Sequence, residues 1–558
     1  MSIALINRLG DWNPQLLREL KGRLKFRNVA LAASLSLLGQ LLLVMSFVRQ
    51  LPVAPIVGKY IYSDYSRYCT GTPPQNYYPH DYLCLRDNFG NFAINWAHWW
   101  LDVFVWLSIA GMFALLVAGT YMVLADQDTE DRRGTLNFIR LSPRSAATIL
   151  LGKLLGVPVL LYLAGMLAIP LHWGAGIAAQ IPPILIASYY GVLLASGFCF
   201  YSAALLFGTV SSWLGGFQPW LGSGTLFFLL CLALKPIQEN ASDLLNLLSP
   251  SATLTSVIWA IGSQEFFRNP IDDFEKLRWF DLPAGQGVAG TVALSLLIYG
   301  FLTYWIWQAL LRRFPNPGAT PISKRQSYLL VAGAEILLLG FALKNPGEPA
   351  GFASLSLLNL LLFLGVTAAL TPNRQALHDW ARYRHANLPA PKGFWHNSLM
   401  RDLVWGEKSP ALVAVGINLA SATAVLLPWA LRWKYAFPSI ILGMNFILIY
   451  AALAQLMLFV KTQKPAVWAV GSVAAAALLP PILLGLLSAT PEKYPAVWLF
   501  SAFPAFWSWE ALNAAPAATV FAVFVAQWLV LLVLSVQLAR KLRRAGESAS
   551  KALLAGKQ

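Results

Sequence analysis

The densest group of ionisable side chains in the sequence lies between two long apolar runs. Four acids fall within six positions, and two arginines, a glycine and a short amphipathic segment follow them: Asp126, Asp128, Glu130, Asp131, Arg132, Arg133, Gly134, Thr135 and Leu136. Ser142-Pro143 interrupts this segment, and the next apolar run begins near Gly152-Lys153. Charged groups clustered on a short amphipathic helix predict a segment that lies in the plane of a membrane surface and offers charge-assisted hydrogen bonds to a partner.

The elements that hold this segment are predicted to be membrane-spanning helices. The chain has 558 residues, of which 57% are hydrophobic and 12% are charged, whereas a soluble domain has about 25% charged residues. This composition predicts an all-α, polytopic integral membrane protein. The net charge of +16 is assigned to loops that face anionic membrane lipids. Nucleic-acid binding is excluded because no basic domain lies outside the predicted spans.

Apolar runs long enough to cross a bilayer occur about twelve times, since a ~30 Å hydrocarbon core takes about 20 residues. The predicted spans are 28–49, 99–124, 146–171, 183–211, 217–236, 286–311, 327–343, 354–370, 409–431, 438–460, 466–488 and 517–539. Before the first span, residues 12–27 place leucines at helical spacing opposite basic residues, which predicts an interfacial helix. Residues 237–285 contain an apolar stretch broken by Ser249-Pro250, and we expect re-entrant or interfacial helices there.

The distribution of basic residues predicts the orientation of these spans. With twelve spans, 28 of the 41 Lys and Arg residues fall on the side that carries both termini and 12 fall on the opposite side, with Lys153 at a span end. The positive-inside rule therefore predicts cytoplasmic N- and C-termini. It also places residues 126–147 in the cytoplasm and the polar loop 50–98 outside.

Two cysteines share the predicted external loop. Cys69 and Cys84 lie in a compartment that permits disulfides, and a bridge closing a loop of this length stabilises by about 3 kcal/mol. The sequence therefore favours a Cys69–Cys84 disulfide over two free thiols.

The order of these features resembles the transmembrane subunit of an ABC transporter of the ABC-2 type. A basic amphipathic helix, a span, an external loop and a second span precede a cytoplasmic motif made of Glu130, Gly134, Thr135, Leu136, Ile139, Ser142-Pro143, Ser145, Ile149, Gly152 and Lys153. Residues 12–27 resemble that family's elbow helix, and 237–285 resemble its re-entrant helices. The resemblance covers about residues 10–311.

The resemblance implies that residues 126–147 form a coupling helix that docks on an ATPase subunit. ATP and Mg²⁺ are then expected on that separate subunit, because this chain contains no G-x-x-x-x-G-K-[ST] pattern, and no cofactor or catalytic residue is expected in the chain itself. Two ATPase domains need two docking helices, so a second permease chain is also expected. The implied function is export of a lipid, glycan or drug-like substrate across a prokaryotic inner membrane.

The second half of the chain departs from a six-span permease. We expect a permease domain at 1–311, a cytoplasmic linker at 312–326, an accessory six-span domain at 327–540 and a basic tail at 541–558. Residues 398–419 repeat the pattern of an amphipathic helix before a span, but the next cytoplasmic loop, 461–465, has no acidic cluster. One coupling helix per chain is therefore predicted.

Three alternatives remain open from the residues. Asp131-Arg132-Arg133-Gly134 partly resembles a loop motif of major-facilitator carriers, which also have twelve spans, and a non-transporting membrane scaffold is a further possibility. An intramembrane enzyme would need a site such as His98, Asp102 and His172, although aromatic neighbours favour a membrane-interface role for these residues. Glu335 is the clearest ionisable residue inside a predicted span, and a structural ion pair is favoured over a substrate or proton site.

Overall fold

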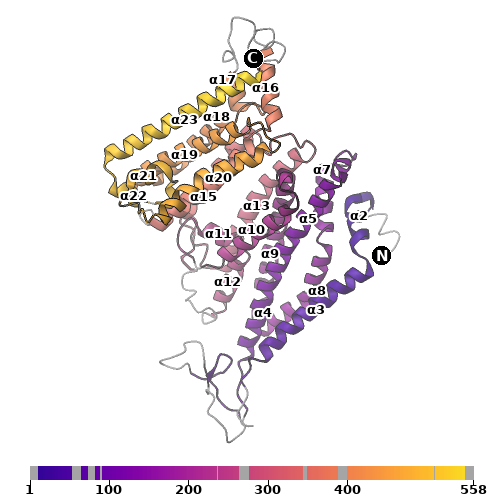
Figure 1. The fold of residues 1–558 in the computed structure, drawn as a ribbon. Helices are drawn as coiled ribbons and strands as arrows, with labels where there is room; N and C mark the ends of the chain where they lie inside the picture. Colours follow the sequence, from indigo (N-terminus) through magenta and orange to yellow (C-terminus); the bar gives the residue numbers. More distant parts are fainter. Residues whose placement is uncertain are drawn as a thin grey trace. The chain divides into compact units, whose positions relative to one another are not determined.

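The computed structural model describes residues 10–52, 65–72, 82–87, 91–235, 237–262, 275–342, 349–386, 399–507 and 509–546. Nearly all regular structure in these ranges is helical (Figure 1). The two described strands, β1 Tyr65–Ser66 and β2 Tyr82–Leu83, form a short antiparallel pair. The predicted all-α class is therefore confirmed.

The described ranges contain ten helices that are long and apolar enough to cross a membrane. They are α3 Phe26–Val48, the continuous helix Trp96–Arg132, α8 Val159–Ala178, α9 Pro183–Val210, α13 Val288–Arg313, residues Ala350–Leu370 of α15, α18 Leu412–Ala430, α19 Ala436–Met457, α20 Pro465–Leu486 and α23 Ala517–Gly546. The multi-pass membrane character is thus confirmed, and each of the ten corresponds to a predicted span.

Two predicted spans are not among these ten. At 217–236 the helix α10 Gln218–Leu232 has 15 residues and is about 22 Å long at 1.5 Å per residue, which is shorter than a ~30 Å hydrocarbon core. At 327–343 the helix α14 Lys324–Ala342 begins with four polar residues and contains Glu335, so less of its length is apolar.

The chain divides into two compact units. The first contains the described residues of Met1–Ile237, Leu245–Leu277 and Leu282–Trp307, and the second contains those of Gln238–Leu244, Arg278–Asp281 and Gln308–Gln558. The main division falls inside α13, close to the end of the permease domain expected from the sequence.

In the first unit, α3, α4 Trp96–Phe113, α8 and α9 form a bundle (Figure 1). The second predicted span is longer than expected, because α4 continues through one turn of π-helix, η1 Ala114–Ala118, into α5 Gly119–Arg132. The acids at 126–131 therefore lie on the end of a spanning helix. A separate helix, α6 Thr135–Arg140, comes only after the turn at Gly134.

The third predicted span, 146–171, is divided in the structure. Helix α7 Ala146–Gly156 ends before Pro158, and α8 begins at Val159. Proline lacks the N–H that an uninterrupted helix would use, which accounts for the break. Helix α7 is instead free to pack against α2 Pro14–Arg23, the described part of the predicted elbow helix.

The elements between α9 and α13 are short. A 3₁₀ helix, η2 Ser212–Phe217, precedes α10. Residues 243–260 form two helices, α11 Asp243–Leu247 and α12 Ser251–Ala260, and the break between them falls at the Ser249-Pro250 pair that the sequence singles out.

In the second unit, α18, α19, α20 and α23 lie next to one another (Figure 1). Buried tryptophans organise its packing: Trp429 stacks on Phe352, and Trp498 and Trp507 share a cluster with α19 and α23. The unit also contains α15 Pro349–Leu370 and shorter helices: α16 Arg374–Ala386, α17 Leu399–Trp405, α21 Pro495–Ser501, η5 Pro504–Phe506 and α22 Glu510–Ala514. Helix α17 directly precedes α18, at the fragment that resembles the elbow helix in sequence.

Candidate functional site

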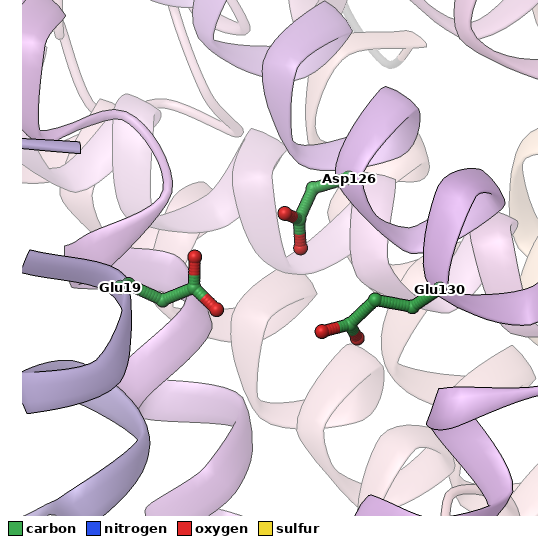
Figure 2. A group of neighbouring side chains, drawn as sticks. All are labelled: Glu19, Asp126 and Glu130. Atoms are coloured by element: carbon green, nitrogen blue, oxygen red, sulfur yellow. The ribbon is translucent and has the colours of Figure 1, made fainter. Parts of the chain in front are cut away.

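The predicted acidic cluster meets the elbow helix and α7 in one ion-pair network. Asp126 and Glu130 are one turn apart on α5, so their side chains share a face of the helix. That face turns towards α2, which contributes Glu19, and towards α7, which contributes Lys153. Figure 2 shows the three carboxylates pointing into a common space.

Lys153 is the centre of the network. Its ammonium lies 2.7 Å from Asp126 Oδ2 and 2.5 Å from Glu130 Oε2, and the residue is 1% exposed. Arginines of α2 complete the set: Arg23 donates to Asp126 Oδ1 at 2.5 Å, and Arg18 is paired with Glu130. The network therefore ties α2, α5 and α7 together through charge-assisted hydrogen bonds.

The same carboxylates are the one group among the described residues that could hold a metal ion by proximity. Oxygens of Glu19, Asp126 and Glu130 lie within 4.8 Å of one another, and Ca²⁺ and Mg²⁺ prefer such ligands. However, Lys153 and the two arginines bring three positive charges to three carboxylates. Because the charge is balanced and the ammonium already bridges two acids, the geometry favours an ion-pair network over a metal centre.

Two glycines of α7 allow α2 to approach this closely. A Cβ atom at Gly156 would lie 2.5 Å from Cβ of Glu19, and one at Gly152 would lie 2.6 Å from Asn13 Oδ1. Asn13 caps α2 by accepting from the Leu16 amide at 3.0 Å, and it also donates to the Thr148 carbonyl at 2.7 Å. The Gly152-Lys153 pair of the motif thus has two structural roles, close helix contact and bridging of the acids.

Beyond the network, α6 presents an exposed apolar surface. Gly134 adopts a left-handed conformation with φ of 72°, which a glycine adopts without strain, and it reverses the chain after α5. On α6, Leu136 and Ile139 are buried, whereas Phe138 is 81% and the following Leu141 is 85% exposed. Large apolar side chains this exposed are typical of a surface that contacts another protein or a membrane.

The remaining predicted coupling residues lie around this tip. Asp128 pairs with Arg132 at 2.5 Å along α5, and Asp131, Arg133 and Thr135 are exposed. Ser142 and Pro143 lie in the turn between α6 and α7. The sequence thus locates the segment but misses the inward direction of Asp126 and Glu130, and it misses the participation of Arg18, Glu19 and Arg23. A lone acid in a basic amphipathic helix was the available signal for Glu19.

On the loop before α4, Cys69 and Cys84 form a disulfide with Cα atoms 4.8 Å apart. The adjacent Arg67 and Tyr68 hold Asp102 of α4, at 2.8 Å and 2.7 Å. Burial, reinforced by the hydrogen bond to Asp102, raises the pKa of Tyr68, so its hydroxyl remains a donor. These contacts fasten the disulfide loop to the first turns of α4.

The three residues considered for an enzyme site are not gathered together. His98 accepts from Arg67 Nε at 3.2 Å beside Asp102, whereas His172 is hydrogen-bonded to Ser108 and Tyr190, each at 2.7 Å. Because Asp102 and His172 have different partners, the geometry does not favour a shared metal or catalytic site.

Glu335 of α14 is fully buried. The expected structural ion pair is not formed, since neither Arg325 on the same helix nor any other described basic residue pairs with this carboxylate; the side chain of Asn359 on α15 is its polar neighbour. The reason is geometric, since Arg325 and Glu335 are ten residues apart on one helix, about 15 Å at 1.5 Å per residue.

The comparisons with known proteins add no relative to this picture. No protein-family model, curated protein or solved structure matches the chain.

Proposed function

We propose that the chain is the permease subunit of an ATP-driven ABC transporter of the ABC-2 type. In this proposal it exports a lipid, glycan or drug-like substrate from a prokaryotic cytoplasm, and a separate ATPase subunit binds ATP and Mg²⁺. Two permease chains and two ATPase domains form the assembly.

The observation that carries the proposal is the connection between α6 and the Lys153 network. Helix α6 follows α5 after a two-residue turn and leads into α7 within a few residues. Helices α5 and α7 are joined by the ion pairs of the buried Lys153, and α5 and α2 by a partly buried ion pair of Arg23. A force applied to α6 would therefore move the three helices as one body. Helix α5 continues into a span, so the movement would reach the membrane.

The docking surface in this proposal is apolar as well as charged. Phe138 and Leu141 would enter a cleft of the ATPase, while Asp131, Arg132 and Arg133 would provide charge-assisted contacts at its edge. Asp126 and Glu130 would transmit the movement from inside the network and would not touch the partner. The first variants for a docking test are therefore those at Phe138 and Leu141.

The topology in the proposal keeps twelve spans with cytoplasmic termini. Helices α10 and α14 would then cross the membrane despite their length and polar residues, and α6 would lie in the cytoplasm as the distribution of Lys and Arg requires. The second unit would be an accessory six-span domain without a coupling helix of its own.

The proposal is tested by purification of the tagged chain from its native membranes, followed by measurement of ATP hydrolysis and identification of copurified proteins. The wild type should retain a protein with a Walker A motif and hydrolyse ATP. The double variant Phe138→Asp and Leu141→Asp should lose both the protein and the activity while remaining monodisperse.

The matched control is Phe138→Leu with Leu141→Met, which preserves the apolar surface and should behave like the wild type. Transport by the purified chain without any ATPase would contradict the proposal and support a secondary carrier. An assembly without transport or ATP hydrolysis would support a scaffold.

A further inference from the structure

A cavity of about 600 Å³ lies within the first unit, lined by α3, α4, η1, α5, α8 and α9. This volume falls in the range of about 300–1,000 Å³ that is typical of ligand sites. Its walls are largely apolar, as a site for a hydrocarbon group requires. The elements that form it are, in the main, candidate membrane spans.

The cavity is elongated along α3. Its lining residues on this helix run from Asn28 to Leu43 and recur every three or four positions, which places them on one face. Asn28 and Leu43 are fifteen residues apart, about 22 Å along the helix axis, so the site is long and has the proportions of an extended acyl chain. Only Phe47 of the 23 residues in α3 is buried, and the face in question therefore has room for a ligand.

Missing side chains produce part of this space. Gly39 of α3 and Gly111 of α4 both line the cavity, and a Cβ atom at either position would meet no atom within 4 Å. The polar groups in the wall already have partners: Ser36 donates to the Ala164 carbonyl at 2.8 Å, and His172 is hydrogen-bonded to Ser108 and Tyr190. An occupant is consequently met by apolar surface along most of its length.

The end of the cavity at Asn28 is next to basic residues. Lys21 of α2, Lys25 and Arg27 precede Asn28 in the chain, and all three are exposed. Basic side chains beside an apolar site complement a ligand with an anionic head and a hydrocarbon tail.

We propose that this cavity binds one acyl chain of an anionic phospholipid, with the phosphate held at Lys25 and Arg27. The inference is independent of the transport proposal, because it requires only that α3, α4 and α8 span a bilayer. A lipid in this position would fill the space between α3 and the helices of the opposite wall.

The test uses the full chain in nanodiscs of phosphatidylcholine that contain a small fraction of phosphatidylglycerol with a diazirine on one acyl chain. After irradiation, mass spectrometry should find label on cavity residues of α3 and α8 in excess of that on the exposed Ile177 and Leu194 of the same bundle. A phosphatidylcholine probe with the same diazirine should label the cavity less.

Two sets of variants distinguish recognition of the acyl chain from recognition of the lipid head group. Filling the cavity with Gly39→Leu and Gly111→Leu should abolish the excess label, whereas Gly174→Leu on α8, also in open space and outside the cavity lining, should preserve it. Lys25→Gln with Arg27→Gln should reduce the preference for phosphatidylglycerol by about tenfold or more and leave labelling by the phosphatidylcholine probe unchanged.

Equal labelling of the cavity and of Ile177 and Leu194 would overturn the proposal, as would label that persists in the filled variant. Equal labelling by the two probes in the wild type would contradict the proposed preference for an anionic head group. If the filled variant does not remain monodisperse, the surface variant Lys25→Gln with Arg27→Gln decides the question, and an unchanged lipid preference in it refutes the site.

Discussion

At the scale of single residues, Lys153 shows what sequence can and cannot predict. The cluster of acids is visible in the sequence because charge is rare in this chain. The direction in which Asp126 and Glu130 point is not visible, because it depends on where α2 and α7 pack around α5. A lone lysine at the start of an apolar run would suggest an interfacial anchor, yet in the structure it bridges two acids at 1% exposure.

Replacement of Lys153 by methionine should destabilise the first unit. Removing one partner of a buried ion pair costs about 3–5 kcal/mol, and we expect the low end because Arg18 and Arg23 still contact the acids. Thermal unfolding in detergent should show a clear decrease in the midpoint temperature. Arg144→Met, an exposed position in the loop before α7, is the control and should unfold like the wild type. An equal midpoint for Lys153→Met would show that the network contributes little.

Glu335 leads to a different expectation. A carboxylate that is buried without an ion pair is costly within a membrane protein, and Glu335→Gln retains the shape of the side chain without the charge. This variant should assemble normally and unfold at the wild-type temperature or above. If its midpoint falls, as the favoured ion-pair interpretation requires, the structural description of this site is wrong. Lost transport with normal assembly would assign Glu335 a functional role.

Lys324, in the segment predicted as a linker, makes stability depend on pH. Its ammonium donates to Leu403 O and Ser409 Oγ, both at 2.7 Å, and to Pro410 O at 3.0 Å. Burial lowers the pKa of Lys324 from 10.5 to about 8, although Asp402 opposes the shift. Between these values the unfolded chain binds more protons than the folded chain, so the contribution of Lys324 to the free energy of unfolding rises with pH.

The corresponding experiment compares the wild type with Lys324→Met in chemical unfolding from pH 7 to pH 10. The stability difference in favour of the wild type should grow above pH 8, by no more than about 3 kcal/mol. Below pH 8 the difference should be constant. A difference that shrinks as the pH rises would contradict the direction of the pKa shift.

At the scale of elements, hydrophobic runs locate most helices but not their joints. Pro158 separates α7 from α8. The hydrophobic run 146–171 does not reveal this break, because the residues on both sides of the proline are apolar. The hydrophobic run also does not reveal that α5 continues to Arg132. The last two turns of this helix are charged, so they lie outside the run although they remain helical. Both features allow packing against α2: the glycines of α7 face α2, and Asp126 and Glu130 on the last turns of α5 point towards it.

A side chain at Gly156 should separate α2 from α7. Gly156→Val places branched atoms where Cβ of Glu19 lies, and neither backbone can move without disturbing the Lys153 network. The decrease in the unfolding midpoint should therefore resemble that of Lys153→Met. Limited proteolysis within residues 10–23 should become faster. Gly22→Ala, at a position on α2 with no atom within 4 Å of an added Cβ, is the control and should be cut no faster than the wild type. Equal cleavage of Gly156→Val would show that α2 is not held by this contact.

At the scale of the whole molecule, membrane composition and basic loops predict much of the architecture, because the bilayer imposes length and charge rules on every span. These rules become weak where a helix is short, as α10 is, or carries an internal carboxylate, as α14 does. The number of spans therefore depends on these two helices. If both cross or neither crosses, the termini lie on the same side, so locating the termini does not separate the two topologies.

The loops on either side of α13 do separate them. With twelve spans, Gln286 lies outside and Asn316 lies in the cytoplasm, whereas with ten spans the two positions exchange sides.

Both side chains are exposed, so single cysteines there can be labelled in a background with Cys199→Ala and Cys231→Ala, in which Cys69 and Cys84 remain paired. With the proposed twelve spans, a membrane-impermeant maleimide applied to intact cells should label Gln286→Cys and spare Asn316→Cys. The positive-inside rule does not separate the two topologies, because 312–326 and 235–285 contain four Lys and Arg residues each and exchange sides together. Lys493→Cys and Lys464→Cys serve as outside and inside references, because both topologies place them identically. Labelling of Asn316→Cys alone would instead mean that α10 and α14 both stop within the membrane or at its surface, and that four basic residues face the outside.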